Sequence, residues 1–270
     1  MIIYLHIGYH RTATTWLQKN FFPVLDGLTY VGRIYQNNAH NLGWINPLSQ
    51  ADDNQYLKRE LLGKLNPYLG STRPLLLSDE NFLRPGRVEL ALARLADLFL
   101  GHEVRFIITV RRQSELIGSR YRKDRLVHPN WKYSLEQALD QEELACVYPL
   151  CKAVEGCACR LRGSKSISLP FYDYDLLETR IRRQFASARI HFTVLEALAT
   201  EPVEELTRLK HFLGASIIDL KSTASYPPEN KSFAEPLSLE MTSYLFKQFK
   251  VSNSKFEQRC GVNVSRWGYC

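Results

Sequence analysis

Four short apolar runs constrain the fold of this 270-residue chain most strongly, because none of them alternates with polar residues. They are the segments 2–7 (IIYLHI), 74–78 (PLLLS), 104–110 (VRFIITV) and 188–195 (ARIHFTVL). Such runs are typical of strands that are buried on both faces. Segments with helical spacing of apolar residues lie between or after them: 14–25, 88–100, 113–126, 174–185 and 202–213. Strands that alternate with helices predict a three-layer α/β fold, with helices on both sides of a central parallel sheet.

The chain is expected to form a single domain over residues 1–270. Its hydrophobic fraction of 45% supports a sizeable core, and no internal repeat, low-complexity tract or Gly/Ser linker divides it. We expect loop or helical insertions around 30–70 and 125–165. The segment 226–236 contains three prolines, so we expect a loop there that can serve as a lid or a binding loop.

Composition predicts a soluble, cytoplasmic protein without membrane insertion. The first residues lack the basic stretch and cleavage site of a signal peptide, and no apolar run approaches the roughly 20 residues of a membrane span. Four of the six cysteines (Cys146, Cys151, Cys157 and Cys159) are close in sequence but lack the C-x-x-C spacing of zinc ribbons. We therefore expect free thiols and no metal. The net charge of +7 favours anionic partners, or else a solvated basic surface.

The segment 8–15 (GYHRTATT) follows the first expected strand, where the turn into a helix commonly binds phosphate. Compared with the nucleotide-binding pattern G-x-x-x-x-G-K-[ST], it keeps Gly8 and Thr15, but Ala13 replaces the second glycine and Thr14 replaces the lysine. The missing lysine argues against hydrolysis of ATP or GTP. A loop with one guanidinium, at Arg11, and several hydroxyls suits a tetrahedral oxyanion. An ordinary strand-to-helix turn is the alternative interpretation.

The loop and three further segments of the chain resemble segments of one protein family. The segment 6–18 (HIGYHRTATTWLQ) resembles the 5′-phosphosulfate loop of sulfotransferases, whose donor is 3′-phosphoadenosine 5′-phosphosulfate (PAPS) and whose nucleotide product is PAP. The segment 108–121 (ITVRRQSELIGSRY) is similar to the 3′-phosphate element of that family, with Arg111 and Ser119 in the binding positions. The segments 194–214 and 252–269 are similar to those of bacterial, carbohydrate-type sulfotransferases.

The resemblance implies a P-loop-like fold, in-line sulfuryl transfer from PAPS to a hydroxyl or an amine, and no metal. The acceptor is expected to be a saccharide, with no nucleic-acid partner. The loop residues expected to bind the donor are Gly8, His10, Arg11, Thr12, Ala13, Thr14, Thr15 and Trp16. A kinase of the same broad fold is one alternative, and a non-catalytic protein that binds an adenine nucleotide or an anionic glycan is another.

Two catalytic roles follow from this resemblance. Arg11 stands where the family more often has lysine, so it keeps a positive charge for the leaving phosphate but is a poor proton donor. Glu80, just after the second expected strand, is the candidate base. Asp79 and His10 are its rivals; helix capping for either carboxylate and a backbone-orienting role for the histidine are the structural alternatives.

Residues near the donor's far end are less distinctive. Lys231, between Asn230 and Ser232, stands where the family often closes over the 3′-phosphate, although an exposed loop lysine is the plainer interpretation. Several aromatic residues are candidates for stacking on rings or for core packing. They are Trp16, Phe82, Tyr172 and Trp267.

Overall fold

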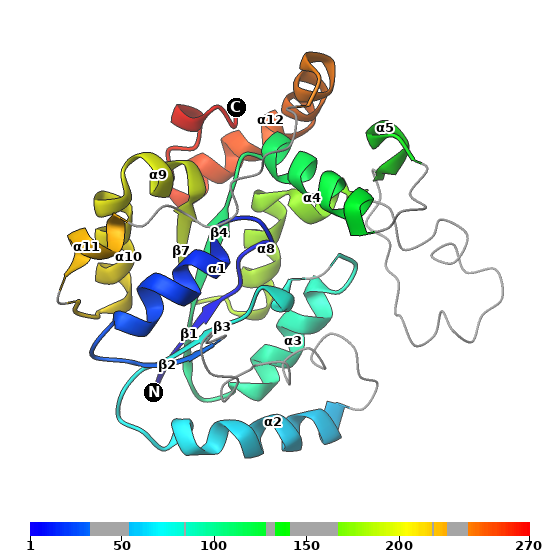
Figure 1. Cartoon of the computed structure of the whole chain (residues 1–270). Coiled ribbons are helices and arrows are strands. Elements are labelled where there is room, and N and C mark those ends of the chain that lie inside the picture. Colours follow the sequence, from blue (N-terminus) through cyan, green and yellow to red (C-terminus); the bar gives the residue numbers. More distant parts are fainter. Residues whose placement is uncertain (33–53, 84, 128–132, 141–166, 218, 226–236) are drawn as a thin grey trace. The chain divides into compact units, whose positions relative to one another are not determined.

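The computed structural model describes residues 1–32, 54–83, 85–127, 133–140, 167–217, 219–225 and 237–270 (Figure 1). The chain divides into two compact units, which we describe separately. The first comprises Met1–Leu83, Leu90–Val110 and Ile181–Lys231, and the second comprises Arg84–Glu89, Arg111–Arg180 and Ser232–Cys270.

A five-stranded parallel sheet forms the centre of the first unit, in the order β2-β3-β1-β4-β7. Its strands are β1 (Ile2–His6), β2 (Thr29–Gly32), β3 (Leu75–Ser78), β4 (Glu103–Val110) and β7 (Arg189–Val194). The four strands expected from apolar runs are confirmed within one or two residues at each end. The edge strand β2 was not predicted.

Both faces of this sheet are covered, as continuous apolar strands require. Tyr4, Leu76 and Ile107 point to one face and pack in a core cluster with residues from the segment after β1 and from the helices that follow β7. On the other face, Phe106 of β4 meets the ring of Phe185 edge-on, with ring centroids 5.0 Å apart. The predicted α/β fold with a central parallel sheet between helices is therefore confirmed.

The helix expected over residues 14–25, directly after β1, is replaced by three short helical turns of different kinds. Instead of one helix over 14–25, the chain forms a single α-helical turn, α1 (Thr14–Trp16), a π-helical turn, η1 (Leu17–Phe21), and a 3-10 turn, η2 (Phe22–Val24), which contains Pro23. Other helices with residues in this unit are α2 (Asn54–Leu69), η5 (Glu80–Phe82), α3 (Val88–Leu98), α9 (Leu195–Thr200), α10 (Pro202–Leu213) and α11 (Leu220–Ala224).

The second unit is mainly helical. Its elements are α4 (Gln113–Val127), α5 (Leu135–Ala138), the strand pair β5 (Leu139–Asp140) and β6 (Ile167–Ser168), η6 (Leu169–Tyr172), the start of α8 (Tyr174–Gln184), α12 (Leu239–Cys260) and η7 (Ser265–Trp267). The long helix α12 was not predicted. It begins at the cap Ser238, whose side chain accepts from the Met241 amide at 3.1 Å, and it ends at Gly261 with a φ of 65°.

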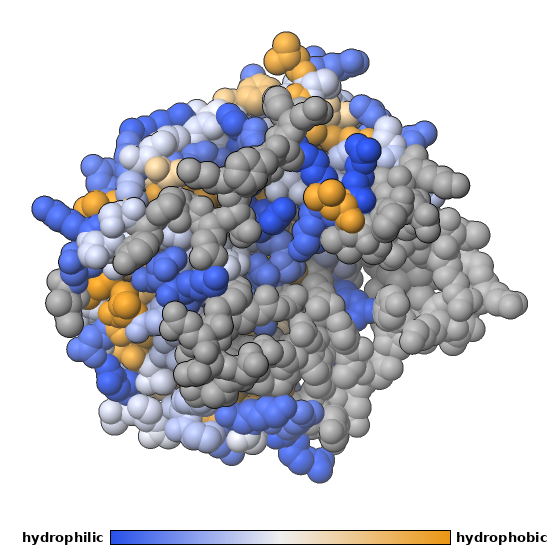
Figure 2. All heavy atoms as spheres, in the orientation of Figure 1, coloured by the Kyte–Doolittle hydropathy of each residue, from blue (hydrophilic) through white to orange (hydrophobic). Residues whose placement is uncertain are grey.

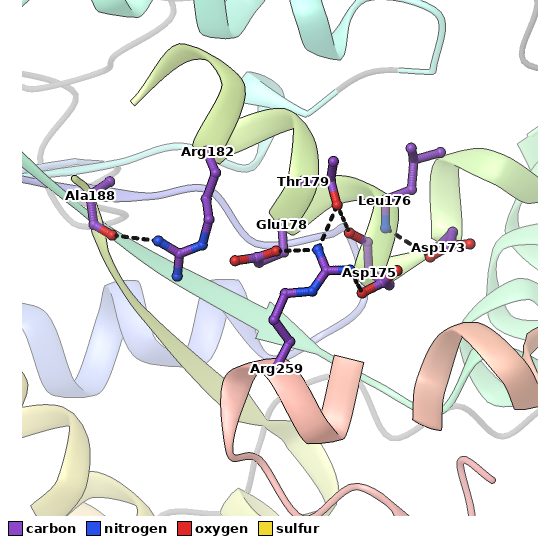
Figure 3. Close-up of polar contacts among 8 residues, drawn as sticks. All are labelled: Asp173, Asp175, Leu176, Glu178, Thr179, Arg182, Ala188 and Arg259. Carbon is purple, nitrogen blue, oxygen red and sulfur yellow. Dashed lines mark hydrogen bonds and ion pairs between the residues drawn. The ribbon is translucent and has the colours of Figure 1, made fainter. Parts of the chain in front are cut away.

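A cluster of charged groups joins α8 and α12 inside the second unit (Figure 3). Arg259 of α12 forms ion pairs of 2.8 Å with Asp175 and with Glu178, and it donates to the Thr179 hydroxyl at 2.7 Å. The Glu178 side chain is fully buried, whereas that of Arg259 is 41% exposed. The helix α12 therefore supplies a positive charge to the buried carboxylate.

Hydrophilic side chains predominate on the visible face of the described residues, with only small hydrophobic areas between them (Figure 2). None of the helices in the described ranges is both long enough and apolar enough to cross a membrane.

Candidate functional site

The loop after β1 lies where the strand order of the sheet reverses. Strand β1 has β3 on one side and β4 on the other, and all three run in parallel. The loop begins with the Ile7 amide, which donates to the Ile107 carbonyl at 2.9 Å. In open parallel sheets, ligands bind beyond the carboxyl ends of the strands at such a reversal. The topology thus puts the segment 8–15 at the expected binding edge.

Gly8 allows this loop to lie directly against β4. A Cβ atom at this position would be 1.8 Å from Thr109 Oγ1 and 2.6 Å from Thr14 Cγ2, so no other residue fits without displacing backbone or neighbours. Thr12 fastens the next turn of the loop, because its hydroxyl donates to the Tyr9 carbonyl at 2.5 Å and lies 2.6 Å from Thr109 Oγ1. The Thr12 side chain is fully buried, so its hydroxyl serves the loop itself.

Two residues of the loop have left-handed backbone conformations that favour glycine. The φ angles are 73° at Arg11 and 64° at Ala13, each of which costs of order 1–3 kcal/mol for a residue with a Cβ atom. Ala13 stands where the nucleotide-binding pattern has its second glycine, so the backbone keeps the shape that this glycine normally provides. Left-handed turns of this kind direct successive amides toward a common point and favour anions.

Glu80 lies beside the loop and contacts it through both carboxylate oxygens. Thr14 Oγ1 donates to Oε2 at 2.8 Å, and His10 Nδ1 lies 3.1 Å from Oε1. The side chain of His10 is 31% exposed and that of Glu80 is 13% exposed. Glu80 begins η5, two residues after β3. Because β3 pairs with β1, the two strands deliver the carboxylate and the loop to the same edge of the sheet.

A second, fully buried layer of polar side chains lies below this contact. Gln18 Nε2 donates to Ser78 Oγ at 2.9 Å, and Ser78 Oγ lies 2.7 Å from His6 Nδ1. Burial lowers the pKa of His6 to about 3, and the negative charge of Glu80 opposes this shift only in part. His6 is therefore neutral near pH 7. Sequence reasoning missed all three residues, although Ser78 is the last residue of the predicted strand 74–78 and His6 is the last but one of the predicted strand 2–7.

Two other candidate residues next to these groups are almost fully buried. Asp79 is 1% exposed, and its amide donates to the His6 carbonyl at 3.2 Å. Trp16 is 2% exposed and packs in the core cluster with Tyr4 and Phe22. Glu80 contacts the loop through both Thr14 and His10.

Arg111 and Ser119 belong to the second unit. The backbone of Arg111 is held by Tyr174, whose hydroxyl accepts from the Arg111 amide at 3.3 Å and donates to the Arg111 carbonyl. The Arg111 guanidinium is 17% exposed and lies 3.4 Å from Glu115. Ser119, inside α4, is 2% exposed. Both side chains thus have little exposed surface.

The C-terminal segment supports the start of α4 through buried amides. Gln113 Nε2 donates to Asn253 Oδ1 at 2.8 Å, and Asn253 Nδ2 donates to Gln113 Oε1 at 3.1 Å and to the Tyr269 carbonyl at 2.7 Å. Arg111 precedes this helix directly. The segment 252–269, singled out from the sequence, therefore has a structural role behind Arg111.

Comparison with known proteins gives a fold but no sequence relative. No protein-family model matches the sequence, and no curated protein matches it. A solved sulfotransferase from Alicyclobacillus acidocaldarius is similar in structure, with a TM-score of 0.56 at 12% identity over 98% of this chain and 97% of that one. The chain has the sulfotransferase fold.

Two other solved sulfotransferases resemble it more weakly. Mouse sulfotransferase SULT7A1 in complex with PAP has a TM-score of 0.43 at 14% identity, covering 95% of this chain and 88% of that chain. The sulfotransferase domain from the curacin biosynthetic pathway has a TM-score of 0.40 at 13% identity, covering 92% and 97%.

Some expectations for this sulfotransferase fold lie outside the described residues. These are Lys231 with its neighbours Asn230 and Ser232, the proline-containing loop 226–236, and the cysteines between 146 and 159. Within the described ranges, no group of three or more His, Cys, Asp or Glu residues is arranged to hold a metal ion. Cys260 and Cys270 are free thiols, as expected.

Proposed function

We propose that this protein is a sulfotransferase that moves a sulfuryl group from PAPS to a hydroxyl or an amine. One observation carries the proposal: the loop after β1 lies at the reversal of the strand order, has no room for a Cβ atom at Gly8, and contacts Glu80 through His10 and Thr14. The loop that we propose to bind the donor and a carboxylate are thus adjacent within one unit. The sulfotransferase fold supports the same interpretation.

The residues present fit the 5′ end of such a donor. The left-handed backbone at Arg11 and Ala13 favours an arrangement of amides that binds an anion. Gly8 lets this loop pack against β4, because a Cβ atom there would overlap Thr109. Arg11 supplies a permanent positive charge, Thr14 and Thr15 supply backbone amides at the start of α1, and Thr15 also supplies a hydroxyl. For the 3′-phosphate we propose Arg111 and Ser119, with Lys231 as a further cation.

Phosphoryl transfer needs a lysine in this loop, and Thr14 stands at the lysine position. Thr14 donates its hydroxyl to Glu80 and leaves no cation at this position. Sulfuryl transfer does not require a lysine at position 14. It requires that the donor be positioned and that a positive charge, here assigned to Arg11, stabilise the leaving phosphate. The loop therefore favours sulfuryl transfer over the kinase alternative.

The chemical step requires that positive charge accompany the leaving phosphate and that a base remove the proton of the acceptor. We assign the positive charge beside the leaving phosphate to Arg11. We assign to Glu80 the carboxylate on which removal of the acceptor proton depends. Asp79 is nearly inaccessible, which favours Glu80 between the two. The acceptor oxygen forms a bond to sulfur while the bond between sulfur and the phosphate oxygen breaks, so the products are a sulfate ester, PAP and one proton.

A saccharide is proposed as the acceptor. The resemblance of the segments 194–214 and 252–269 to carbohydrate-type enzymes supports it, and the net charge of +7 suits an acidic polysaccharide. A screen of labelled PAPS against polysaccharides, lipids and phenols tests this choice. Transfer to phenols alone would contradict it while leaving sulfuryl transfer intact.

Donor binding is tested by thermal unfolding with PAP, AMP and ATP. PAP at 100 times its Kd is expected to add about 2.7 kcal/mol of stability, with much smaller effects from AMP and ATP. Arg111→Ala should abolish the preference for PAP over AMP. Its neighbour provides the matched control, because Arg112 contacts the same Glu115 but is not assigned to the phosphate. Equal stabilisation by all three nucleotides would refute the 3′-phosphate assignment.

A further inference from the structure

We propose that His10, rather than Glu80, takes the proton from the acceptor, and that Glu80 acts through His10. This inference rests on the proposed sulfuryl transfer and specifies its base. It assigns the proton to one atom, His10 Nε2. Glu80 then becomes a positioning residue that holds the imidazole.

The contacts of Glu80 argue against a direct role as base. Each of its carboxylate oxygens is already engaged by the loop, Oε2 by Thr14 and Oε1 by His10. The carboxylate is also the less accessible partner, with 13% exposure against 31% for His10. An acceptor approaching the loop from solvent therefore meets the imidazole before the carboxylate.

The contact between the two side chains fixes which nitrogen of His10 carries the proton. An ionised carboxylate only accepts hydrogen bonds, so the 3.1 Å contact requires the proton of a neutral His10 to be on Nδ1. The lone pair then remains on Nε2. Within the described part of the chain, Nε2 of His10 has no hydrogen-bond partner. A free lone pair on an oriented imidazole is the arrangement that general-base catalysis needs.

The step balances without another reactant. The acceptor O–H bond breaks and its proton moves to His10 Nε2, while the oxygen forms its bond to sulfur. The bond between sulfur and the bridging phosphate oxygen breaks, and its electron pair leaves with PAP beside Arg11. The resulting imidazolium is stabilised by Glu80, and it later returns its proton to water.

A second histidine near the loop does not fit this role. His6 is fully buried, and burial lowers its pKa to about 3, so no acceptor can reach it. His102 is a control of another kind. It precedes β4 and therefore lies at the opposite edge of the parallel sheet from the loop. His102→Ala is expected to leave turnover unchanged.

The first test is independent of activity. In protein labelled with ¹⁵N-histidine, the neutral His10 ring should show its proton on Nδ1, and Glu80→Ala should abolish this preference. A neutral His10 ring with its proton on Nε2 in the unaltered protein would overturn the proposal. PAP binding measured on the same samples shows whether the loop remains intact.

The second test is chemical rescue. His10→Ala is expected to lower kcat by about 10²–10⁴-fold with little change in the Kd for PAP, and added imidazole should restore at least tenfold. Imidazole should not restore Glu80→Ala to the same extent, because that variant keeps its histidine. Near-normal turnover in His10→Ala, or loss of turnover that imidazole does not restore, would assign the base to Glu80. Absence of both PAP binding and transfer in the unaltered protein would instead refute the proposed function.

Discussion

Replacement of Gly8 by alanine tests the packing that shapes the candidate site. The new Cβ atom would be 1.8 Å from Thr109 Oγ1, far below the sum of the van der Waals radii of carbon and oxygen. Overpacking at buried positions costs about 1–3 kcal/mol. Because Thr109 is held by its hydrogen bond with Thr12, we expect the cost of this overlap to be about 3 kcal/mol or more. For a chain of this size, about 3 kcal/mol corresponds to a fall in Tm of roughly 6–12 °C.

A double-mutant cycle with Thr109 separates this clash from other effects. Thr109→Ala alone removes the contact with Thr12, whose hydroxyl keeps its bond to the Tyr9 carbonyl, and we expect a loss of about 1 kcal/mol. In the double variant the 1.8 Å overlap is absent and the 2.6 Å approach to Thr14 Cγ2 remains, so Gly8→Ala should cost less than in the unaltered protein but more than nothing. The free energies of unfolding are measured by chemical denaturation.

Additivity of the two changes would refute this reasoning. Independent substitutions add within about 0.3–0.5 kcal/mol, whereas the predicted coupling is at least about 1 kcal/mol and is favourable in sign. PAP binding provides a second measurement on the same four proteins. Gly8→Ala should weaken binding, because a displaced loop no longer presents its amides together, and Thr109→Ala should partly restore it.

Further predictions concern the two buried polar clusters. Ser78→Ala should cost about 2–4 kcal/mol in urea unfolding, because it leaves buried atoms of Gln18 and His6 without this partner; a loss below about 0.5 kcal/mol would contradict the buried layer. The folded-state pKa of His6, about 3, is below its ordinary 6.5, so the unfolded chain binds the proton first. Stability should be complete above about pH 6.5 and fall toward pH 3 by up to about 1.4 kcal/mol per pH unit, and the part due to this group should vanish in His6→Gln. Arg259→Met should cost about 2–4 kcal/mol, since it removes a positively charged partner from the fully buried Glu178. Additional replacement of Glu178 by glutamine should recover part of that loss, and no recovery would show that the charge is unimportant.

Burial on both faces made four of the five strands predictable, and its absence hid the fifth. Among the described residues, strand β2 is at the edge of the sheet and pairs with β3 alone, and it begins with the partly exposed Thr29 and Tyr30. It therefore lacks a continuous apolar run. The helix α12 had a usable signal in the spacing of its buried residues and in its two caps. Its buried residues are Met241, Leu245, Phe249, Asn253 and Phe256.

The neighbourhood of Glu80 and the loop could be inferred, because two adjacent parallel strands end at the same edge. The layer of His6, Gln18 and Ser78 could not, since it depends on strand register and on the π-helical turn that positions Gln18. Neither feature has a local sequence signature. The single domain over residues 1–270 and the roles of Arg111 and Ser119 stay predictions.

The loop shows how residues other than glycine are held in unfavourable backbone conformations. Along the segment 10–14, fastened and strained residues alternate: His10, Thr12 and Thr14 each hold a hydrogen bond or ion pair, while Arg11 and Ala13 between them have positive φ angles. Strain of this kind persists only when the surroundings determine the conformation. The contacts of Thr12 with Thr109 of β4, and of His10 and Thr14 with Glu80 after β3, hold the loop in this conformation. The chain can therefore keep a glycine-like turn at Ala13 and carry a guanidinium at position 11.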